Sequence, residues 1–488
     1  MTISTHFTSP AEWALTHFGG VSLGDLRRTR RVQTLVAGWA RQPGATIPQL
    51  SGTQPYASKA AYSLLSLPTA TPDALQAPHR QLVQSALQAE GTYLLIEDTT
   101  ELSWPEAPVR REGLGPVGRG KARSQGVLLH SLVAACWCDG PAQAATKRPA
   151  LALLGLCDQQ FHVRQPVPAA EKASPGSASR LRQQRGTPLE SALWTHSLRA
   201  LGTAPPQARW VVVADRGADV YEHLQQCHQQ GLGFVVRAAQ DRVLVKAATD
   251  QSTERLFATA RAVASSGEFV LSLRGRPQQP ARDVVLHVSY TPLLALRAPQ
   301  RPGGAPGKGA PVPCAVVRVW EPVSAEADAP GLEWLLLCDR PVTSFAQAHE
   351  CARQYASRWL IEDFHKALKT GLGAEKLQLQ TAERLFAAVS LLSVVALALV
   401  DLREKSRIQP DEPAEAAGLE TTALRVLKHY SRRPVCTVRD VYYALAGLGG
   451  HLGRTGDGPP GWLTLWRGLM TLRLLVEGVN LANQLKID

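Results

Sequence analysis

Two short apolar runs, each followed by an aspartate, most constrain how this chain can fold. Residues 93–96 and 210–213 are apolar and of strand length, and Asp98 and Asp215 follow them. Continuous apolar runs are typical of strands buried on both faces of a parallel sheet, and α/β sheets bind ligands beyond the carboxyl ends of such strands. Taken alone, Asp215 is equally suited to cap a helix. The repeated pattern favours an α/β fold that brings both aspartates to one sheet edge.

A third acidic residue lies within residues 355–369, whose pattern predicts an amphipathic helix. At ~100° per residue, one face is apolar and can pack on a sheet; it consists of Leu360, Ile361, Phe364, Ala367 and Leu368. The opposite face is polar and consists of Tyr355, Arg358, Glu362, His365, Lys366 and Lys369. Its one carboxylate lies among cationic side chains, so this face suits an anionic partner. A solvated surface helix is the simpler alternative for such a pattern.

The net charge of the chain favours the same kind of partner. The chain has 488 residues, of which 53 are Lys or Arg and 41 are Asp or Glu, giving a formal net charge of +12. This surplus indicates nucleic acid, with an acidic membrane surface as the second candidate. The N-terminal residues 9–67 are predicted to be helical and contain an arginine cluster, for which we expect contacts with phosphates: Arg27, Arg28, Arg30 and Arg31.

Other sequence features favour a cytoplasmic protein. Apolar residues make up 44% of the chain and charged residues 19%, an ordinary globular composition. The eight cysteines include no CxxC pair, so we expect reduced thiols and neither a zinc site nor a disulfide framework. The N-terminus has no basic and apolar regions of the signal-peptide kind. Residues 385–400 are apolar but include two serines, which predicts a buried core helix rather than a membrane span.

The middle and the end of the chain show two further patterns. Short β-type runs between about residues 240 and 335 predict a β insertion before the helix with Glu362. Residues 166–188 are rich in polar and small residues and are predicted to be a loop. Near the end, an apolar stripe suits either intrachain packing or a partner helix, and it consists of Trp462, Trp466, Leu469, Leu472, Val476 and Val479.

The predicted fold can bring Asp98, Asp215 and Glu362 together. Three converging carboxylates cannot all remain ionised without a counter-cation, and an all-oxygen site suits Mg²⁺ or Mn²⁺. Paired divalent ions activate an attacking oxygen and stabilise the leaving oxygen in phosphodiester displacement. The cationic residues beside Glu362 can hold phosphates. Phosphodiester chemistry on DNA or RNA is therefore expected, and a nuclease, a resolvase and a transposase all share this equipment.

The spacing of four residues resembles a family signature. Tyr355, Arg358, Glu362 and Lys369 match, in type and spacing, the Y-(2)-R-(3)-E-(6)-K signature of the bacterial cut-and-paste transposases of insertion-sequence family four. The resemblance covers nearly the whole chain in order. It includes LGDLRRTRR, IEDTTELS, ADRGADVYEHL, LEWLLL and GLGGHLGRTGDGPPGW. Residues 166–188 and 296–313 resemble the family least.

This resemblance implies a fold and an enzyme class. It implies an α/β fold with three parts: an N-terminal α-helical domain (1–70) that binds transposon-end inverted repeats, a ribonuclease-H-like catalytic core with a β-strand insertion (71–404), and a C-terminal α-helical dimerisation domain (405–488). Asp98, Asp215 and Glu362 would form a DDE triad that binds two Mg²⁺ ions, which Mn²⁺ can replace. The protein would act as a homodimer on double-stranded DNA in the bacterial cytoplasm, with no role at a membrane.

The resemblance also implies the course of the reaction. One strand is nicked at the transposon end, a hairpin forms and is opened, and the 3′ end is joined to target DNA. Trp334 would stack on a base flipped out of the end, although without the resemblance it would be taken for a core residue. Tyr355 and Arg358 would hold the phosphate of that nucleotide, and the remaining expected DNA contacts are Arg237, His365, Lys366 and Lys369.

Two other functions are weighed against this one. A catalytically silent DNA-binding regulator or inhibitor of transposition would keep the fold without the chemistry, which the intact triad and the intact N-terminal segment argue against. A metal-dependent nuclease without strand transfer would not require Trp334, Tyr355 and Arg358 together.

Overall fold

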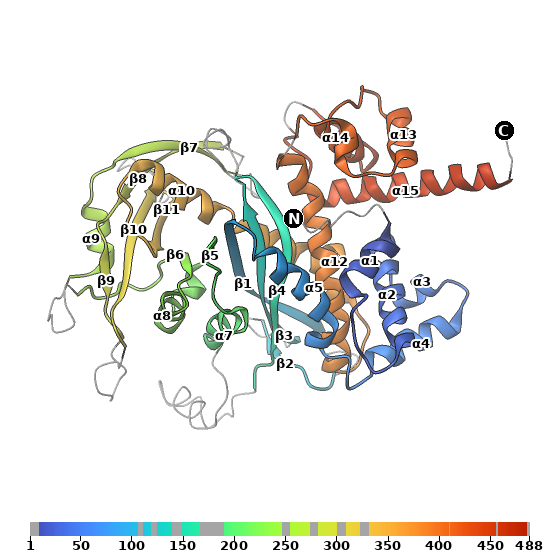
Figure 1. The fold of residues 1–488 in the computed structure, drawn as a ribbon, viewed down its shortest axis with the longest axis horizontal. Helices are drawn as coiled ribbons and strands as arrows, with labels where there is room; N and C mark the ends of the chain where they lie inside the picture. Colours follow the sequence, from blue (N-terminus) through green and yellow to red (C-terminus); the bar gives the residue numbers. More distant parts are fainter. Residues whose placement is uncertain are drawn as a thin grey trace.

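A computed structural model describes residues 9–105, 111–118, 124–138, 149–165, 190–245, 254–273, 282–299, 309–322, 331–408, 410–454 and 457–485. Its described part has one large mixed sheet with helices on both faces, and two further groups of helices from the two ends of the chain (Figure 1). The long helix α12 (Ala382–Ile408) runs beside both groups. The predicted α/β fold is confirmed at this level. The predicted loop at 166–188 lies outside the described residues.

Five strands form the part of the sheet that carries the two aspartates. They are β1 (Gly91–Pro105), β3 (Ser124–Trp137), β4 (Leu151–His162), β5 (Ala208–Ala214) and β6 (Gly233–Arg237). Their order is β4-β3-β1-β5-β6, in which β3 is antiparallel to β1 and β4, whereas β5 and β6 run parallel to β1. The short β2 (Gly115–Val117) also pairs with β3. The two apolar runs therefore lie side by side in the sheet.

Strand β1 is longer than its apolar run predicted. It continues past Asp98 to Pro105, so this aspartate lies in the middle of the strand and not at its carboxyl end. The extension is stabilised because β3 pairs with β1 as far as Pro105. The parallel pairing with β5, by contrast, ends at Ile96 opposite Val213. Asp98 and Asp215 therefore both lie just beyond the same end of the parallel ladder.

The β insertion extends the central sheet. Strand β11 pairs antiparallel with β6, and β10, β8 and β7 follow in this order, while β9 pairs with β10. An unpaired strand edge favours pairing with further strands, which accounts for the continuation at β6. The insertion also contains a helix, α9, that the β-type runs did not predict. The bounds are α9 (Leu256–Ala262), β7 (Gly267–Leu273), β8 (Arg282–Tyr290), β9 (Leu294–Leu296), β10 (Val312–Trp320) and β11 (Glu333–Cys338).

Alternate residues of β1 face two different apolar cores. Leu94 and Ile96 belong to one core, and Tyr93 and Leu95 belong to the core on the opposite face of the sheet. Successive side chains of a strand point to opposite faces. Asp98 therefore lies on the face of Ile96, whereas its neighbour Glu97 lies on the other face.

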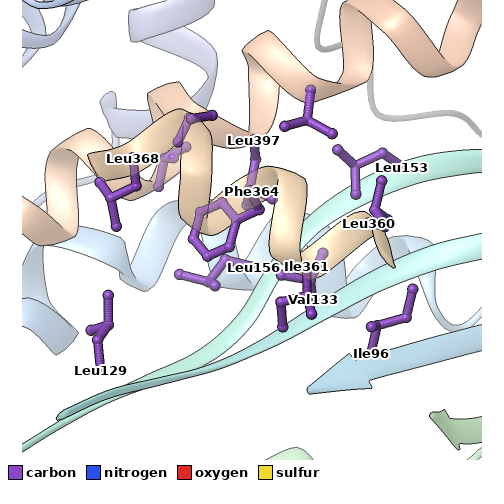
Figure 2. Close-up of a cluster of buried hydrophobic side chains, with 14 of the residues drawn as sticks. Ile96, Leu129, Val133, Leu153, Leu156, Leu360, Ile361, Phe364, Leu368 and Leu397 are labelled. Atoms are coloured by element: carbon purple, nitrogen blue, oxygen red, sulfur yellow. The ribbon is translucent and has the colours of Figure 1, made fainter. Parts of the chain in front are cut away.

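The face with Asp98 is covered by the helix that carries Glu362. This helix, α11 (Trp359–Lys366), buries its apolar side against the sheet and α12 (Figure 2). Ile361 and Phe364 are fully buried. The side chains labelled around them come from β1, β3, β4 and α12: Ile96, Leu129, Val133, Leu153, Leu156 and Leu397. The apolar side of the predicted amphipathic helix is therefore confirmed.

The periodicity predicted one continuous helix over residues 355–369, but the structure divides this segment. Tyr355 belongs to α10 (Phe345–Ala356), α11 begins at Trp359, and a π-helical turn, η3 (Ala367–Gly371), follows it. The break places Arg358 in the N-cap position of α11. An angular projection assumes a straight helix, so it could not show that the polar residues lie on separate elements.

The opposite face of the sheet, with Glu97, is covered by two other helices. They are α7 (Ala192–Leu201) and α8 (Tyr221–Gln229). Leu198 and Leu224 are fully buried in the core on this face. A short 3₁₀ helix, η2 (Arg216–Ala218), connects β5 to α8 and begins immediately after Asp215. The elements after β5 thus carry the chain from one face of the sheet to the other.

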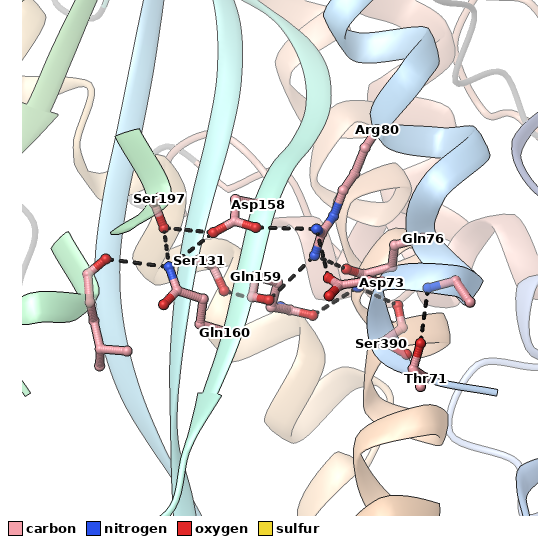
Figure 3. A network of polar contacts seen from close by, with 12 residues as sticks. Thr71, Asp73, Gln76, Arg80, Ser131, Asp158, Gln159, Gln160, Ser197 and Ser390 are labelled. Atoms are coloured by element: carbon pink, nitrogen blue, oxygen red, sulfur yellow. Dashed lines mark hydrogen bonds and ion pairs between the residues drawn. The ribbon is translucent and has the colours of Figure 1, made fainter. Parts of the chain in front are cut away.

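The N-terminal helices are attached to the sheet through α5 and a buried polar network (Figure 3). Arg80 of α5 pairs with Asp158 of β4 at 3.1 Å, and Gln76 donates to the side chain of Gln159 and to the carbonyl of Ser390 in α12, both at 2.9 Å. Buried polar groups are costly unless they are hydrogen-bonded, so these bonds select one arrangement. The helices are α1 (Pro10–Phe18), α2 (Leu26–Arg41), α3 (Ile47–Ser51), α4 (Pro55–Leu65) and α5 (Pro72–Ala86).

The C-terminal helices pack on the other end of α12. Trp462, Leu469 and Leu472 of the predicted stripe are buried, so the first half of α15 serves intrachain packing. The second half projects from the molecule and exposes Leu481 and Leu485 (Figure 1). The elements are η5 (Ala414–Ala417), α13 (Thr421–Tyr430), α14 (Val438–Leu448) and α15 (Trp462–Leu485). Helix α13 was not predicted.

Helix α12 is the buried core helix that residues 385–400 predicted. Between Leu385 and Val400 its residues are at most 2% exposed, except for Phe386, which is half-buried. Within the described ranges it is the one helix long and apolar enough to cross a membrane, and 94% of its most apolar window is buried inside the protein. This burial is what the core helix of a globular protein shows.

Two buried histidines join α1 to the sheet. Nε2 of His79 accepts a hydrogen bond from the backbone N–H of Leu156 at 2.9 Å, so the proton of this neutral ring lies on Nδ1. Nδ1 of His79 lies 3.0 Å from Nδ1 of His17 and therefore donates to it. Protonation of either ring at its accepting nitrogen would place two donors opposite each other. The contact therefore requires both rings to be neutral.

We predict that acid weakens this contact. Burial lowers the pKa of His17 to about 4, and burial followed by the charges of His17 and Arg80 lowers the pKa of His79 well below 6.5. The unfolded chain therefore binds more protons than the folded one below pH ~6.5. The unfolding free energy decreases as the pH is lowered through that window. Between pH 6.5 and 4, His17 alone should remove about 3 kcal/mol of unfolding free energy.

Thermal denaturation between pH 7 and 5 tests this prediction. His17→Asn should lose less stability on acidification than the wild type, because Asn Oδ1 can accept the same hydrogen bond and does not titrate. The matched control is His228→Asn at an exposed position of α8, which should keep the wild-type pH dependence. Equal slopes for wild type and His17→Asn would contradict the prediction.

Candidate active site

Three carboxylates from three elements lie on one face of the sheet. Asp98 is in the middle of β1, Asp215 follows β5, and Glu362 is in the first turn of α11. The side chain of Asp98 is 18% exposed and that of Glu362 is 39% exposed, so both remain open to solvent. The sheet alternation and the packing of α11 thus bring together residues that are 264 positions apart in the sequence, counted from Asp98 to Glu362.

The environment of Asp98 disfavours the ionised form of its carboxyl group. Its pKa is raised to about 7, first by burial, then by the negative charge of Asp215, with a smaller contribution from Glu362. The guanidinium of Arg358 and a hydrogen bond from the N–H of Thr99 act in the opposite direction. A pKa raised this far marks a carboxylate that lacks sufficient positive charge nearby.

Arg358 is the counter-cation of this group. Its Nη1 lies 3.4 Å from Oδ2 of Asp98, and its Nη2 lies 2.5 Å from Oε1 of Glu362. Burial lowers the pKa of Arg358, but the charges of Tyr355, Glu362 and Asp98 outweigh it and raise the pKa overall. One guanidinium therefore bridges two of the three carboxylates. Through these ion pairs it links α11 to β1.

The donor set fits a divalent cation once this guanidinium withdraws. Carboxylate oxygens are the ligands that Mg²⁺ and Mn²⁺ prefer, and the raised pKa of Asp98 shows that the group lacks a nearby cation. Within the described residues, no three His, Cys, Asp or Glu side chains form a group close enough to hold a metal. The reason is visible here, because Arg358 lies between Asp98 and Glu362. Metal binding would require Arg358 to release at least one of them.

Asp215 is held by its own loop. Its Oδ1 accepts a hydrogen bond of 2.7 Å from the N–H of Gly217, so it caps the 3₁₀ helix η2. Asp215 therefore both caps a helix, as the sequence allowed, and belongs to the group of three carboxylates. The cap restricts the side chain and keeps it on the Asp98 side of the sheet.

An aromatic pair lies beside the carboxylates. The ring of Tyr355 meets that of Trp334 edge to face, with centroids 5.1 Å apart, and both residues are buried. Arg237, the last residue of β6, donates to the carbonyl of Glu333 at 2.7 Å, next to Trp334. Tyr355, Trp334 and Arg237 are therefore brought together around the start of β11.

The remaining predicted DNA contacts differ in exposure. Lys366 is exposed and Lys369 half-buried, so both ammonium groups can reach a phosphate. His365, by contrast, is buried, and its pKa falls to about 3, first because of burial and then because of Lys369. The structure therefore does not place His365 on an open polar face, as the helical projection predicted. His365 lies within α11 itself, and the packing of this helix against the sheet encloses its ring.

The arginine cluster of the N-terminal helices lies on α2. Arg27, Arg28 and Arg30 are exposed and Arg31 is half-buried. Arg27 pairs with the N-cap residue Asp25 at 2.9 Å, with its own side chain 88% exposed. An exposed ion pair of this kind contributes little to stability. These side chains are therefore free to exchange partners with an anion at the surface.

Sequence reasoning missed a buried polar group directly behind the site. Glu97 is fully buried on the other face of β1 and faces two histidines, His130 and His223. The sequence patterns identified neither histidine as a partner of Glu97. The alternation of side chains along the strand could have indicated this burial. Glu97 and Asp98 are adjacent and must face opposite sides of a sheet that is buried on both faces, so one of the two carboxylates had to be buried.

Two segments of the chain match known family models. Residues 10–70 match the model described as "Transposase DNA-binding", and residues 193–399 match the model described as "Transposase DDE domain". The first segment includes the arginine cluster of α2, and the second includes Asp215 and Glu362. Asp98 precedes the second segment. Its place in the site follows from the pairing of β1 with β5 and from its ion pair with Arg358.

We predict that Asp98 destabilises the metal-free protein at neutral and higher pH. Its raised pKa means that the folded state holds more protons than the unfolded state between pH ~4 and ~7, so stability falls as pH rises through this window. At pH 8 in EDTA, Asp98→Asn should therefore have an unfolding free energy roughly 2–4 kcal/mol higher than that of the wild type. It should accordingly melt at a higher temperature.

The same thermal scans at lower pH check the direction of this pH dependence. The advantage of Asp98→Asn should shrink toward pH 4, where the wild-type carboxyl is also neutral. Asp411→Asn, at a side chain that is 79% exposed, is the matched control and should follow the wild type throughout. A variant less stable than the wild type at pH 8 would show that the charge of Asp98 is fully compensated in the folded state.

Proposed function

We propose that this chain, which carries a transposase DNA-binding domain and a transposase DDE domain and is therefore a DDE transposase, excises a mobile DNA element and joins its 3′ ends to new target DNA. The observation that carries the proposal is the convergence of three carboxylates: Arg358 pairs with both Asp98 and Glu362, and the charge of Asp215 raises the pKa of Asp98. Carboxylates that share a cation are suited to phosphodiester displacement when that cation is replaced by metal ions.

Within this class we assign the chain to insertion-sequence family four, with a close resemblance to the Tn-five transposase. The Y-R-E-K spacing of Tyr355, Arg358, Glu362 and Lys369 supports this assignment. The strand arrangement supports a ribonuclease-H-like catalytic core, because three antiparallel strands are continued by two that run parallel to β1.

Asp98, Asp215 and Glu362 would hold two Mg²⁺ ions, or Mn²⁺ in their place. When bound, these ions polarise the scissile phosphate and lower the pKa of the attacking hydroxyl group. Nicking, hairpin formation, hairpin opening and strand transfer are all in-line displacements at phosphorus, so one group of carboxylates can serve all four. Arg358, once it leaves Asp98 and Glu362, is free to bind a DNA phosphate as a planar bidentate donor.

The aromatic pair would support the hairpin step. Closing a hairpin bends the strand sharply, and extruding one base relieves the crowding; such a base stacks on an aromatic side chain. Trp334 is 6% exposed and covered by the edge of Tyr355, so stacking requires the tyrosine ring to turn aside. Arg237 and Lys366 would contact the adjoining phosphates, and the movement of Tyr355 would accompany the release of Arg358.

The two ends of the chain would supply DNA recognition and pairing of subunits. The exposed arginines of α2 would contact phosphates of the transposon end, where they position the protein without reading sequence. The projecting half of α15 exposes apolar residues, including Leu474, Leu481 and Leu485, and suits contact with a second subunit. The active form would be a homodimer that holds two DNA ends, acting on the nucleoid in the bacterial cytoplasm.

Hairpin-ended products would test the proposal. Purified protein, MgCl₂ and a plasmid carrying the DNA that flanks this reading frame are incubated, and the products are separated on denaturing gels. We expect hairpin-ended fragments from the wild type and none from Asp98→Ala or Glu362→Ala, because each removes one carboxylate of the triad. A gel-shift assay should show that both variants still bind the end, since their N-terminal helices are unchanged.

Other outcomes identify the rival functions. Nicks or random cuts without hairpins would indicate a metal-dependent nuclease without strand transfer. Binding without cleavage would indicate a catalytically silent regulator of transposition. Loss of end binding in Glu362→Ala equal to its loss of cleavage would contradict the role of Glu362 in chemistry.

Trp334→Ala separates the hairpin step from the first nick. We expect nicking within about twofold of the wild type and hairpin formation reduced by about tenfold, since base stacking on an aromatic ring contributes ~1–3 kcal/mol. The matched control is Trp320→Ala on the neighbouring strand β10, where the indole contacts Arg318 and not Tyr355. A normal hairpin yield from Trp334→Ala would refute the stacking role.

A further inference from the structure

A buried polar cluster lies behind the active site, on the opposite face of the sheet. It consists of Glu97 of β1, His130 of β3, His223 of α8 and Trp194 of α7. Glu97, His130 and His223 are fully buried, and Trp194 is 6% exposed. None of the four takes part in the chemistry proposed above. A buried carboxylate is costly unless it is paired, so this cluster requires a physical reason.

Both histidines lie against the carboxylate of Glu97. Nε2 of His223 lies 2.9 Å from Oε1 of Glu97, and Nε2 of His130 lies 3.5 Å from Oε2. Nδ1 of His130 lies 2.8 Å from the hydroxyl of Thr99, which can donate to it and so leave the ring proton on Nε2, facing Glu97. Burial raises the pKa of Glu97, but the two histidines outweigh it and lower the pKa. Glu97 is therefore in contact with both β3 and α8.

The cluster contacts the segments that carry both aspartates. On one side, Glu97 precedes Asp98 in β1, and His130 bonds Thr99, whose N–H donates to Oδ1 of Asp98 at 2.7 Å. The residues on either side of Asp98 therefore both contact His130 or His223. Rotation or sliding of β1 at Asp98 would break these contacts.

On the other side, the cluster reaches the Asp215 loop through Trp194. Its indole meets the ring of His130 at 4.8 Å and that of His223 at 6.1 Å between centroids, both edge to face. The same indole lies against Gly217, where an added Cβ would come within 2.9 Å of Trp194 Cζ2. Gly217 is the residue whose N–H holds Asp215. One buried cluster thus supports the backbone of both aspartates.

We propose that Glu97 is a positioning residue for metal binding, which sets the relative placement of Asp98 and Asp215. This inference rests on the metal site of the proposed function. The contacts of Glu97 with His130 and His223, and those of both rings with Trp194, hold the segments that carry the two aspartates in one arrangement. Partners behind metal ligands commonly change metal affinity by 10–100-fold when they are replaced.

A thermal-shift titration with MnCl₂ alone, on the full chain without DNA, measures this effect directly. We expect the half-saturating Mn²⁺ concentration of Glu97→Gln to rise by about tenfold, the lower end of that range, because Glu97 does not itself touch the metal. The matched control is Glu101→Gln on the same face of the same strand, where the side chain is 40% exposed and pairs with Arg164. It should keep the wild-type half-saturating concentration.

Two further variants keep the test informative if Glu97→Gln folds poorly. His223→Gln places an amide N–H near the position of Nε2 and should keep the wild-type Mn²⁺ affinity. His223→Leu removes that donor and should weaken Mn²⁺ binding by about tenfold. If Glu97→Gln and His223→Leu lower the melting temperature without metal but keep the wild-type half-saturating concentration, Glu97 has a structural role only and the inference is overturned.

The same titration separates this inference from the proposed function. Asp98→Asn should lose the Mn²⁺-dependent shift, because it removes a ligand. If the wild type shows no shift that depends on Asp98, the metal site and this inference both fail. If the wild-type shift depends on Asp98 but Glu97→Gln reaches half-saturation at the same concentration, the metal site stands and only the positioning role of Glu97 fails.

Discussion

Every feature of the candidate site depends on the alternation of side chains along β1. The strand is buried on both faces, so each residue must face one of two cores, and a shift of one residue would exchange them. Asp98 faces α11 because Ile96 does, and Glu97 faces α7 and α8 because Leu95 does. The same constraint acts on β5, where Val213 and Asp215 share a face. The carboxylates of the site and the buried carboxylate behind it are consequences of one register.

Helix α12 makes that register the only stable one. It is apolar on all sides and contacts α11, β4, the N-terminal helices α2 and α5, and the C-terminal helices α14 and α15. Each fully buried leucine contributes roughly 2 kcal/mol when it leaves water, so any displacement of the sheet relative to α12 would cost many such contacts. The two ends of the chain also meet beside it, where Arg473 of α15 donates to the carbonyl of Ala40 in α2 at 2.7 Å. Helix α2, for which we propose contacts with DNA, is therefore directly connected to α15.

Within this frame, the active site balances negative charge with one movable cation. Arg358 neutralises Asp98 and Glu362 in the metal-free protein, but incompletely, since the pKa of Asp98 stays raised. A divalent ion would supply the missing charge and release the guanidinium for a phosphate. The folded core holds Asp98 and Asp215 close enough for the negative charge of Asp215 to raise the pKa of Asp98. This incompletely compensated charge favours the binding of a cation.

By itself, the sequence determined the α/β class, the adjacency of two aspartate-bearing strands, the apolar face of α11 and the burial of α12. These follow from local patterns of apolar residues, because such patterns report which side chains must leave water. Only the tertiary structure decided that β1 continues past Asp98, that the insertion extends the sheet from β6, that the helix breaks at Arg358, and that His365 is buried. It alone paired Glu97 with His130 and His223, and Arg358 with Asp98. Those contacts join residues far apart in the chain, and no local periodicity records which of two buried faces a distant side chain will meet.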